Sequence, residues 1–174
     1  MTALLYLCLF AVGLGAGWVI GIQMLPRVIM KVVLQRVDKT AGGPNRMEHR
    51  GPADPHRPTI VRQSPDLLYS ACAFDLDAGA VQVEVGPTEG YLSVAFFDRA
   101  TNNFRTLTPK DLAATNGPVT LVSARHTAPP DTGVVVQSPT QRGIILIRRR
   151  ISTDESLARM LKAQTGDHCQ VIAG

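Results

Sequence analysis

The sequence predicts a mainly β domain, a sandwich or open barrel with a C-terminal helix, preceded by one N-terminal transmembrane helix. Three observations predict this fold class in the 174-residue chain. The chain opens on a long, uncharged, apolar stretch. Short apolar runs rich in β-branched residues follow, separated by turn-forming residues. Near the C-terminus, one segment has apolar residues at helical spacing.

The apolar stretch is long enough to cross a bilayer as a helix. Residues 4–22 carry no charge, and at 1.5 Å per residue they span about 28 Å, close to the hydrocarbon thickness. The competing interpretation is a cleaved signal peptide, which requires a basic region and a small-residue cleavage site. No Lys or Arg precedes Arg27, and residues 23–27 offer no small-residue pair, so we favour an uncleaved anchor.

Three glycines of this stretch share one helix face. Gly13, Gly17 and Gly21 are spaced at i, i+4 and i+8. Small residues let two membrane helices approach closely, and this approach supplies their packing contacts. The glycine stripe predicts a helix–helix interface with a second copy or with the anchor of a partner. The alternative is chance, because glycine is common in membrane helices.

The helix is expected to continue past the membrane, so that residues 1–39 form an anchor with a juxtamembrane amphipathic helix. Apolar residues recur at helical spacing beyond the anchor: Leu25, Val28, Ile29, Val32 and Val33. Arg27, Lys31 and Gln35 fall on the other side. Such a helix either lies on anionic headgroups or continues the anchor into water, and the sequence leaves both open.

Residues 40–58 are predicted to form a flexible linker. They concentrate Gly and Pro and contain almost no apolar side chain, so they have little surface to bury. A flexible coil of this length reaches about 24 Å, which would let the domain sit slightly off the bilayer.

Positive charge is concentrated next to the anchor. Residues 27–62 hold eight basic and three acidic side chains, net +5, whereas residues 63–174 hold ten and eleven, net −1. Binding to a phosphate backbone requires a basic face on the folded domain. Beyond the short run 148–150 we find no such face, so the expected partner is the lipid bilayer and not a nucleic acid.

Residues 59–174 are predicted to form the β-rich globular domain. Residues 81–85 alternate between Val and polar side chains, which indicates a half-buried strand. The continuous apolar runs 91–97, 134–136 and 144–147 are typical of strands buried on both faces. About seven short strands at this spacing favour a sandwich or an open barrel.

One helix is expected after the last of these strands. Ser152 and Glu155 have the spacing of a capping box, and Gly166 is expected to end the helix. The apolar stripe between them consists of Leu157, Met160 and Leu161.

The cysteines give one candidate disulfide. Cys8 lies inside the anchor, which leaves Cys72 on a predicted strand and Cys169 after the final helix. In an oxidising compartment these two would clip the C-terminus to the sheet. The alternative is that Cys72 is a small buried hydrophobe and Cys169 a free thiol.

The order of motifs in residues 64–104 is distinctive. The motif segments are Ser64-Pro65-Asp66-Leu67-Leu68-Tyr69-Ser70, Phe74-Asp75-Leu76, Gly90-Tyr91-Leu92-Ser93-Val94, Phe97-Asp98 and Thr101-Asn102. This order resembles the bacterial family called domain of unknown function 1254, although Ala80 stands where that family usually has Pro. The resemblance implies a β-rich envelope protein of Gram-negative bacteria with no established activity.

The same resemblance suggests a polar cluster and a partner. The polar residues matched to the family motif are Asp66, Tyr69, Ser70, Asp75, Asp98 and Asn102. Longer family members continue into a second domain, of the family numbered 1214. A homo-oligomer, or a heteromer with a protein carrying the 1214-type domain, is therefore expected.

The sequence contains no clear catalytic or metal-binding motif. Ser123, His126 and Asp131 lie close together, but no Gly-x-Ser-x-Gly nucleophile elbow exists, and we interpret them as a polar loop. The histidines lack metal-ligand spacing, so we expect no metal and no cofactor. The catalytic residues, if the protein is an enzyme, are unknown.

Two hypotheses for function remain. We favour a membrane-anchored binding or interaction module of the cell envelope, acting with a partner subunit. The alternative is an envelope enzyme acting on a small or lipid-derived substrate through the polar cluster.

The basic residues after the anchor favour a cytoplasmic domain, whereas the resemblance and the cysteine pair favour export. We therefore expect a single-pass inner-membrane protein whose globular domain is periplasmic.

Overall fold

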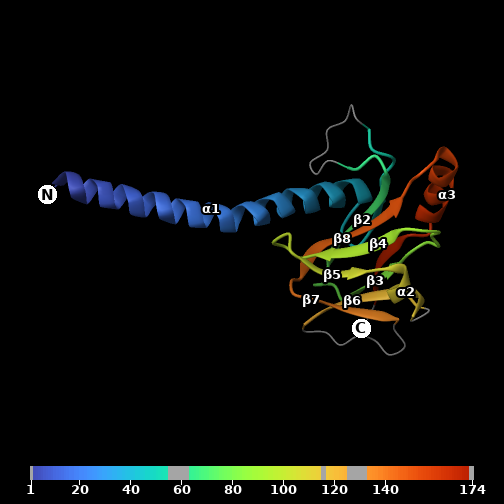
Figure 1. Cartoon of the computed structure of the whole chain (residues 1–174). Helices are drawn as coiled ribbons and strands as arrows, with labels where there is room; N and C mark the ends of the chain where they lie inside the picture. Colours follow the sequence, from blue (N-terminus) through green and yellow to red (C-terminus); the bar gives the residue numbers. More distant parts are fainter. Residues whose placement is uncertain (1, 55–62, 115–116, 125–132, 173–174) are drawn as a thin grey trace.

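The computed structural model describes residues 2–54, 63–114, 117–124 and 133–172. Figure 1 shows a long helix, α1, that projects from a domain built of two layered β-sheets. The predicted fold class is confirmed: two sheets pack as a sandwich, a helix lies near the C-terminus, and a long apolar helix precedes the domain.

Helix α1 (Thr2–Ala41) is continuous through the anchor and beyond it. It is long and apolar enough to cross a membrane, and its most apolar 18 residues are not buried in the protein. Pro26 lies inside the helix and removes one backbone donor, which accounts for the change of direction in the middle of α1 in Figure 1. The helix ends two residues later than predicted.

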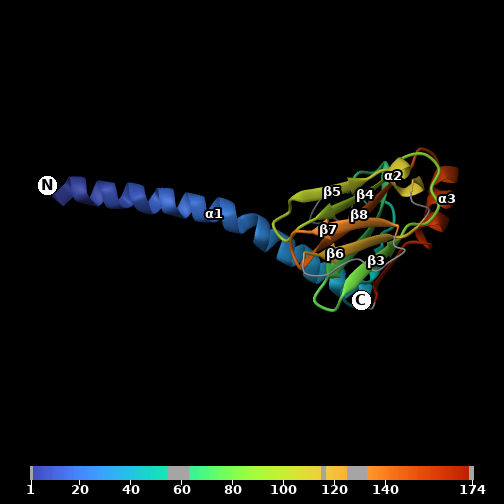
Figure 2. The ribbon, with the colours of Figure 1, turned by 90° about the horizontal axis from the view of Figure 1, so that it is seen from below.

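The last part of α1 packs on the β domain instead of on headgroups. Its buried side chains are Met30, Leu34 and Val37, one or two turns apart. They contact the outer face of the five-stranded sheet at Ala71, Ala73 and Ile144. The alanines leave room for the helix to lie close to the sheet. In Figure 2, seen from below, the end of α1 passes behind the four-stranded sheet, on the far side of the sandwich.

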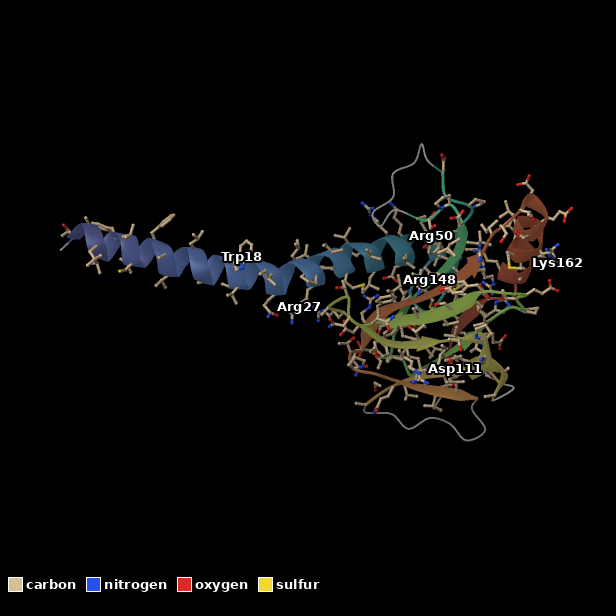
Figure 3. The ribbon with its side chains drawn as sticks, in the orientation of Figure 1. Trp18, Arg27, Arg50, Asp111, Arg148 and Lys162 are labelled. Carbon is tan, nitrogen blue, oxygen red and sulfur yellow. A yellow bond between two sulfur atoms is a disulfide. The ribbon has the colours of Figure 1, made fainter. Side chains whose placement is uncertain are left out.

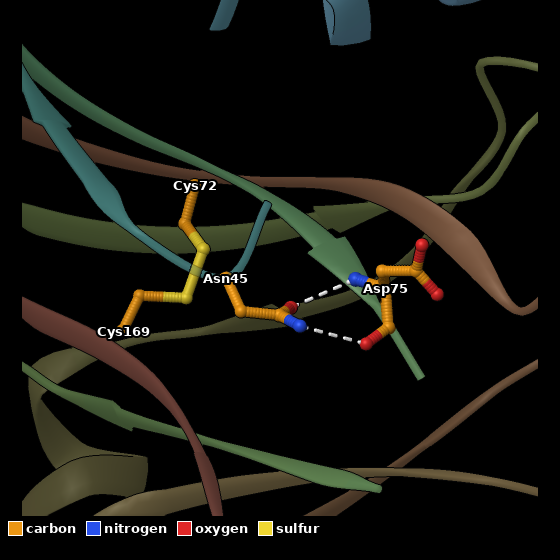
Figure 4. The surroundings of a disulfide bond; sticks show 4 residues. All are labelled: Asn45, Cys72, Asp75 and Cys169. Carbon is orange, nitrogen blue, oxygen red and sulfur yellow. Dashed lines mark hydrogen bonds between the residues drawn. A yellow bond between two sulfur atoms is a disulfide. The ribbon is translucent and has the colours of Figure 1, made fainter. Parts of the chain in front are cut away.

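The region predicted as a flexible linker, 40–58, contains ordered structure. Its first two residues end α1, and strand β1 (Met47–His49) pairs antiparallel with β2. The Asn45 amide donates to the carbonyl oxygen of Asp75 and accepts from its backbone N–H, both at 2.8 Å (Figure 4). The linker prediction is wrong for this segment because pairing with β2 supplies the stability that its composition lacks. Residues 55–58 lie outside the described residues.

The larger sheet has five antiparallel strands in the order β1-β2-β8-β4-β5. Its further members are β2 (Leu67–Asp75), β8 (Arg142–Arg150), β4 (Leu92–Phe97) and β5 (Asn103–Leu107). Nine residue pairs join β2 and β8, from Leu67 opposite Arg150 to Asp75 opposite Arg142. One end of this sheet therefore holds Asp75 and Arg142, and the other holds Leu67 and Arg150.

The smaller sheet has the order β7-β6-β3-β9. Its members are β3 (Ala80–Glu84), β6 (Val119–Ser123), β7 (Val134–Ser138) and β9 (His168–Ile172), with β6 and β7 parallel. The core lies between the sheets, where Phe74 and Phe96 from one meet Val81, Val83 and Leu121 from the other. Strand β4 is buried on both faces as predicted, whereas β7 alternates between buried and exposed side chains.

Two helices complete the domain: α2 (Pro109–Ala113) and α3 (Asp154–Gln164). The predicted capping box is wrong by one residue, because the N-cap of α3 is Thr153, whose hydroxyl accepts from the Ser156 N–H. Met160 is buried, while Leu161 of the predicted stripe is exposed.

A disulfide joins the two sheets. Cys72 in the middle of β2 is bonded to Cys169 of β9, 97 residues later (Figure 4). Both cysteines belong to the core between the sheets. The bond thus ties the final strand to the larger sheet.

Candidate functional site

The polar residues of the family motif do not form one site. Asp66 and Tyr69 lie at one end of β2 and Asp75 at the other, so Tyr69 and Asp75 are about 20 Å apart along the strand. Tyr69 accepts a hydrogen bond from the Ser64 N–H at its hydroxyl, and the Asp66 carbonyl accepts one from Ile151. Tyr69 closes the turn before β2, and Asp66 extends the pairing of β2 with β8, both at the end of the sheet away from the anchor.

Asp98 and Asn102 build the turn between β4 and β5. The Asp98 carboxylate accepts hydrogen bonds from the backbone N–H groups of Ala100 and Asn102, at 2.8 and 2.9 Å. It also accepts from the Asn102 side-chain amide at 2.9 Å. Thr101, inside this turn, has a positive φ of 69°. The pair therefore fixes a tight turn, which accounts for the Asp-x-x-Thr-Asn pattern on structural grounds.

Asp75 belongs to a second group, where α1 meets the sheet. The Arg142 guanidinium contacts Asp38 of α1 at 2.7 Å and Asp75 at 3.3 Å. The three side chains are partly exposed, which limits the energy of each pair. Their main role is to fix the position of the helix, because they join α1 to the first residue of β8 and the last residue of β2.

Ser70 belongs to a third group, which surrounds a fully buried ion pair. Arg149 and Asp167 have side-chain exposures of 1% and 0%. Arg149 donates from Nη1 and Nη2 to the two carboxylate oxygens of Asp167, at 2.6 and 2.5 Å. Ser70 Oγ donates to the same carboxylate at 2.6 Å, and so does the Gly86 N–H at 2.9 Å. Arg149 Nε donates to Thr88 Oγ1 at 2.7 Å.

This Arg149–Asp167 network was missed by the sequence reasoning. Arg148, Arg149 and Arg150 resemble a solvated charge run, but on a strand the middle residue points away from its neighbours. Arg149 therefore enters the interior, whereas Arg148 bonds Ser93 on the outer face and Arg150 is exposed. Each oxygen of Asp167 accepts two hydrogen bonds, so the network is satisfied within itself and acts as a structural clamp.

A cavity of about 540 Å³ lies at the opposite end of the sandwich, beside α1. Its walls come from α1, from three turns and from the first residue of β8: Lys31, Leu34, Gln35, Asp77, Arg99, Thr140, Gln141 and Arg142. Hydrogen bonds hold the turns together, since Leu76 donates to the Gln141 carbonyl at 2.9 Å and Arg99 donates from its N–H to Thr140 Oγ1 at 3.2 Å. The sequence did not indicate that these turns lie together, because the three turns are far apart in the chain.

The glycine stripe lies on the free part of α1. A Cβ atom built on Gly13, Gly17 or Gly21 would meet nothing within 4 Å. The stripe is therefore open to a second helix.

Of the predicted polar loop, Ser123 ends β6, and His126 and Asp131 lie outside the described residues. Among the described residues, no three His, Cys, Asp or Glu side chains are placed to hold a metal ion.

Comparisons with known proteins agree with this fold. The VPA0106 protein from Vibrio parahaemolyticus superposes with a TM-score of 0.65 and 15% identity, over 90% of this chain and 37% of that one. A putative uncharacterized protein from Burkholderia cenocepacia gives a TM-score of 0.50 and 17% identity, over 78% and 38%. The chain thus spans less than two fifths of the length of either solved chain. No curated protein matches the sequence.

The family comparison gives the same answer as the motif order. The model of a protein family of unknown function, DUF1254, matches residues 44–170, more than half of the chain. Its range begins just after α1 and covers the larger sheet, α3 and the smaller sheet as far as the middle of β9. The chain therefore belongs to the DUF1254 family.

Proposed function

We propose that the protein is a membrane-anchored binding or interaction module of the bacterial cell envelope that acts with a partner subunit. The observation that carries this proposal is the continuity of α1. One helix runs from the apolar stretch into the sheet, where Met30, Leu34 and Val37 are buried. Such a helix holds the end of the sandwich bearing Asp75 and Arg142 next to the bilayer.

The proposed location is a single pass through the inner membrane with the domain in the periplasm. The Cys72–Cys169 bond supports this orientation, because structural disulfides persist in oxidising compartments. The basic residues that follow the anchor favour the opposite orientation by the positive-inside tendency. We give the disulfide more weight, since Arg27 and Lys31 have a second explanation as contacts to lipid headgroups.

The proposed partner is a second membrane chain. Gly13, Gly17 and Gly21 form an open face on α1, suited to close approach of another helix. The family resemblance suggests two occupants, a second copy or a protein carrying the 1214-type domain. Both would place a further domain beside this one at the membrane surface.

Affinity purification from cross-linked membranes tests the proposal. Full-length protein with a C-terminal tag is extracted in mild detergent, and the co-purifying chains are identified and quantified. A second copy, detected through a second tag, or one other chain in near-equal amount is the expected result. A full-length protein that purifies as a monomer, with and without cross-linking, would contradict the proposed role with a partner.

A further inference from the structure

We propose that the cavity beside α1 binds the headgroup of an aminophospholipid, with the phosphate against Lys31 and Arg99 and the ammonium against Asp77. This inference rests on the proposed function only for its placement of the domain at the bilayer. It adds the ligand class and the residues that would hold it.

The cavity lies on the side of the domain that faces the anchor. Lys31, Leu34 and Gln35 come from α1, Arg142 begins β8, and the remaining wall residues come from the turns that follow β2, β4 and β7. In Figure 1 the anchor part of α1 extends away from this end of the sandwich, while α3 lies at the other end. A lipid would therefore reach the cavity directly from the bilayer.

Arg27 lies at the depth of the headgroup layer, about 7 Å beyond Ile22, and Lys31 lies about 6 Å further from the hydrocarbon. This layer extends roughly 5–8 Å beyond the hydrocarbon on each side. Lys31 lies four residues after Arg27, the first charge of the chain, so the two are about 6 Å apart along one helix face. Figure 3 shows Arg27 on the side of α1 where the β domain lies.

The opposite side of the same helical turn is apolar. Leu25, Val28 and Ile29 have exposed fractions of 61%, 52% and 41%, since the β domain does not cover them. Exposed apolar side chains at this level are expected to enter the boundary between headgroups and acyl chains. The helix thus places apolar surface on its lipid side and cations on its domain side.

Two of the three cations in the cavity are available to a ligand. The Arg142 charge is already matched by Asp38 and Asp75. Within the described part of the chain, neither Lys31 nor Arg99 forms an ion pair, and both are exposed. They come from different elements and line the same cavity. Two free cations converging on one hollow suit a phosphodiester, which bears one negative charge and two free oxygens.

The cavity also presents acceptors. Asp77 is an exposed carboxylate in its wall, and Gln141 Oε1 is a buried oxygen without a hydrogen-bond partner among the described residues. Lys31 and Arg99 supply the donors of the same wall. Donors and acceptors side by side favour a zwitterionic headgroup with an N–H donor over a purely anionic one.

The test measures lipid retained by full-length protein in native mass spectrometry, after exchange into detergent with added phosphatidylethanolamine or phosphatidylcholine. Wild-type protein is expected to retain phosphatidylethanolamine. The double variant Lys31→Gln/Arg99→Gln is expected to retain about five- to tenfold less, because two charge-assisted contacts are lost. Asp77→Asn is expected to reduce the preference for phosphatidylethanolamine over phosphatidylcholine.

Arg150→Gln is the matched control, because it removes one positive charge from the exposed far end of β8. It is expected to retain lipid like the wild type. Equal retention by the double variant and the wild type would overturn the inference. So would displacement of the lipid by millimolar inorganic phosphate, which would identify a site for the free anion. Lipid retained by a chain that purifies without a partner would contradict the proposed function and support the cavity's role.

Discussion

Arg149 and Asp167 form a bidentate ion pair inside the sandwich, with both side chains inaccessible to solvent. The pair joins β8 to the turn between α3 and β9. Through Gly86 and Thr88 it also holds the turn that follows β3. Ser70 of β2 donates to the same carboxylate, so four segments of the chain meet at one charge pair, at the end of the domain away from the anchor.

Removing one partner of this pair is expected to destabilise the domain strongly. Asp167→Ala leaves the Arg149 charge buried without compensation, which costs about 3–5 kcal/mol in the free energy of unfolding. Urea unfolding of the full-length chain in detergent, followed by circular dichroism of the β domain, measures the loss. Arg150→Ala, one residue along the strand and exposed, should change the free energy by about 0.5 kcal/mol or less. A loss below about 1 kcal/mol for Asp167→Ala would contradict a clamping role.

The disulfide is expected to contribute to stability mainly through the unfolded chain. Cys72 and Cys169 are 97 residues apart, so their bond restricts a loop worth about 4 to 5 kcal/mol in the chain-entropy model. Cys72→Ser/Cys169→Ser should therefore lower the free energy of unfolding, measured by urea titration, by up to that amount. Cys8→Ser, in the anchor, should leave the free energy of unfolding unchanged. If both thiols are alkylated in unreduced, denatured protein from membranes, the bond does not form in cells.

The periplasmic orientation makes a prediction about protease access. Protease added to intact spheroplasts should digest the β domain and remove a C-terminal tag. A cytoplasmic marker protein must remain intact in the same sample. If the protease digests the domain only after lysis, the domain lies in the cytoplasm. The disulfide would then no longer support a periplasmic orientation.

The glycine stripe is expected to hold the anchor to a second helix. Gly17→Ile places a branched side chain on the open face and should reduce cross-linking without affecting membrane insertion. Gly15→Ile is the control, because Gly15 lies on roughly the opposite face and is equally free of contacts. Unchanged cross-linking in Gly13/Gly17/Gly21→Ile would show that the stripe is incidental.

Features with a local signal were predictable from the sequence. The apolar run predicted α1, and β-branched segments between turns predicted the main strands of the sandwich. Helical spacing predicted α3, although the cap was placed at Ser152 instead of Thr153, since both residues suit that position. Each of these signals lies within about twenty neighbouring residues.

Features that depend on distant partners were not predictable. Strand β1 has three residues, too few for a periodic pattern, and it is stable because it pairs with β2. Arg149 resembled part of a solvated charge run, because no sequence pattern indicates that it pairs with Asp167, 18 residues later. Leu34 and Val37 pack on the sheet because the small residues Ala71 and Ala73 face them. The sequence of the helix does not show which strand it will pack against.

The most direct test of the account measures which end of the domain lies at the bilayer. In a Cys8→Ser background, a fluorophore is attached at Pro139→Cys, in the turn near α1, or at Glu155→Cys, on α3. The full-length protein is reconstituted into vesicles whose lipid headgroups carry a nitroxide quencher. Because α1 fixes the domain, the label at 139 should be strongly quenched and the label at 155 should not. Equal quenching at both positions, or none at 139, would contradict a domain held against the membrane by α1.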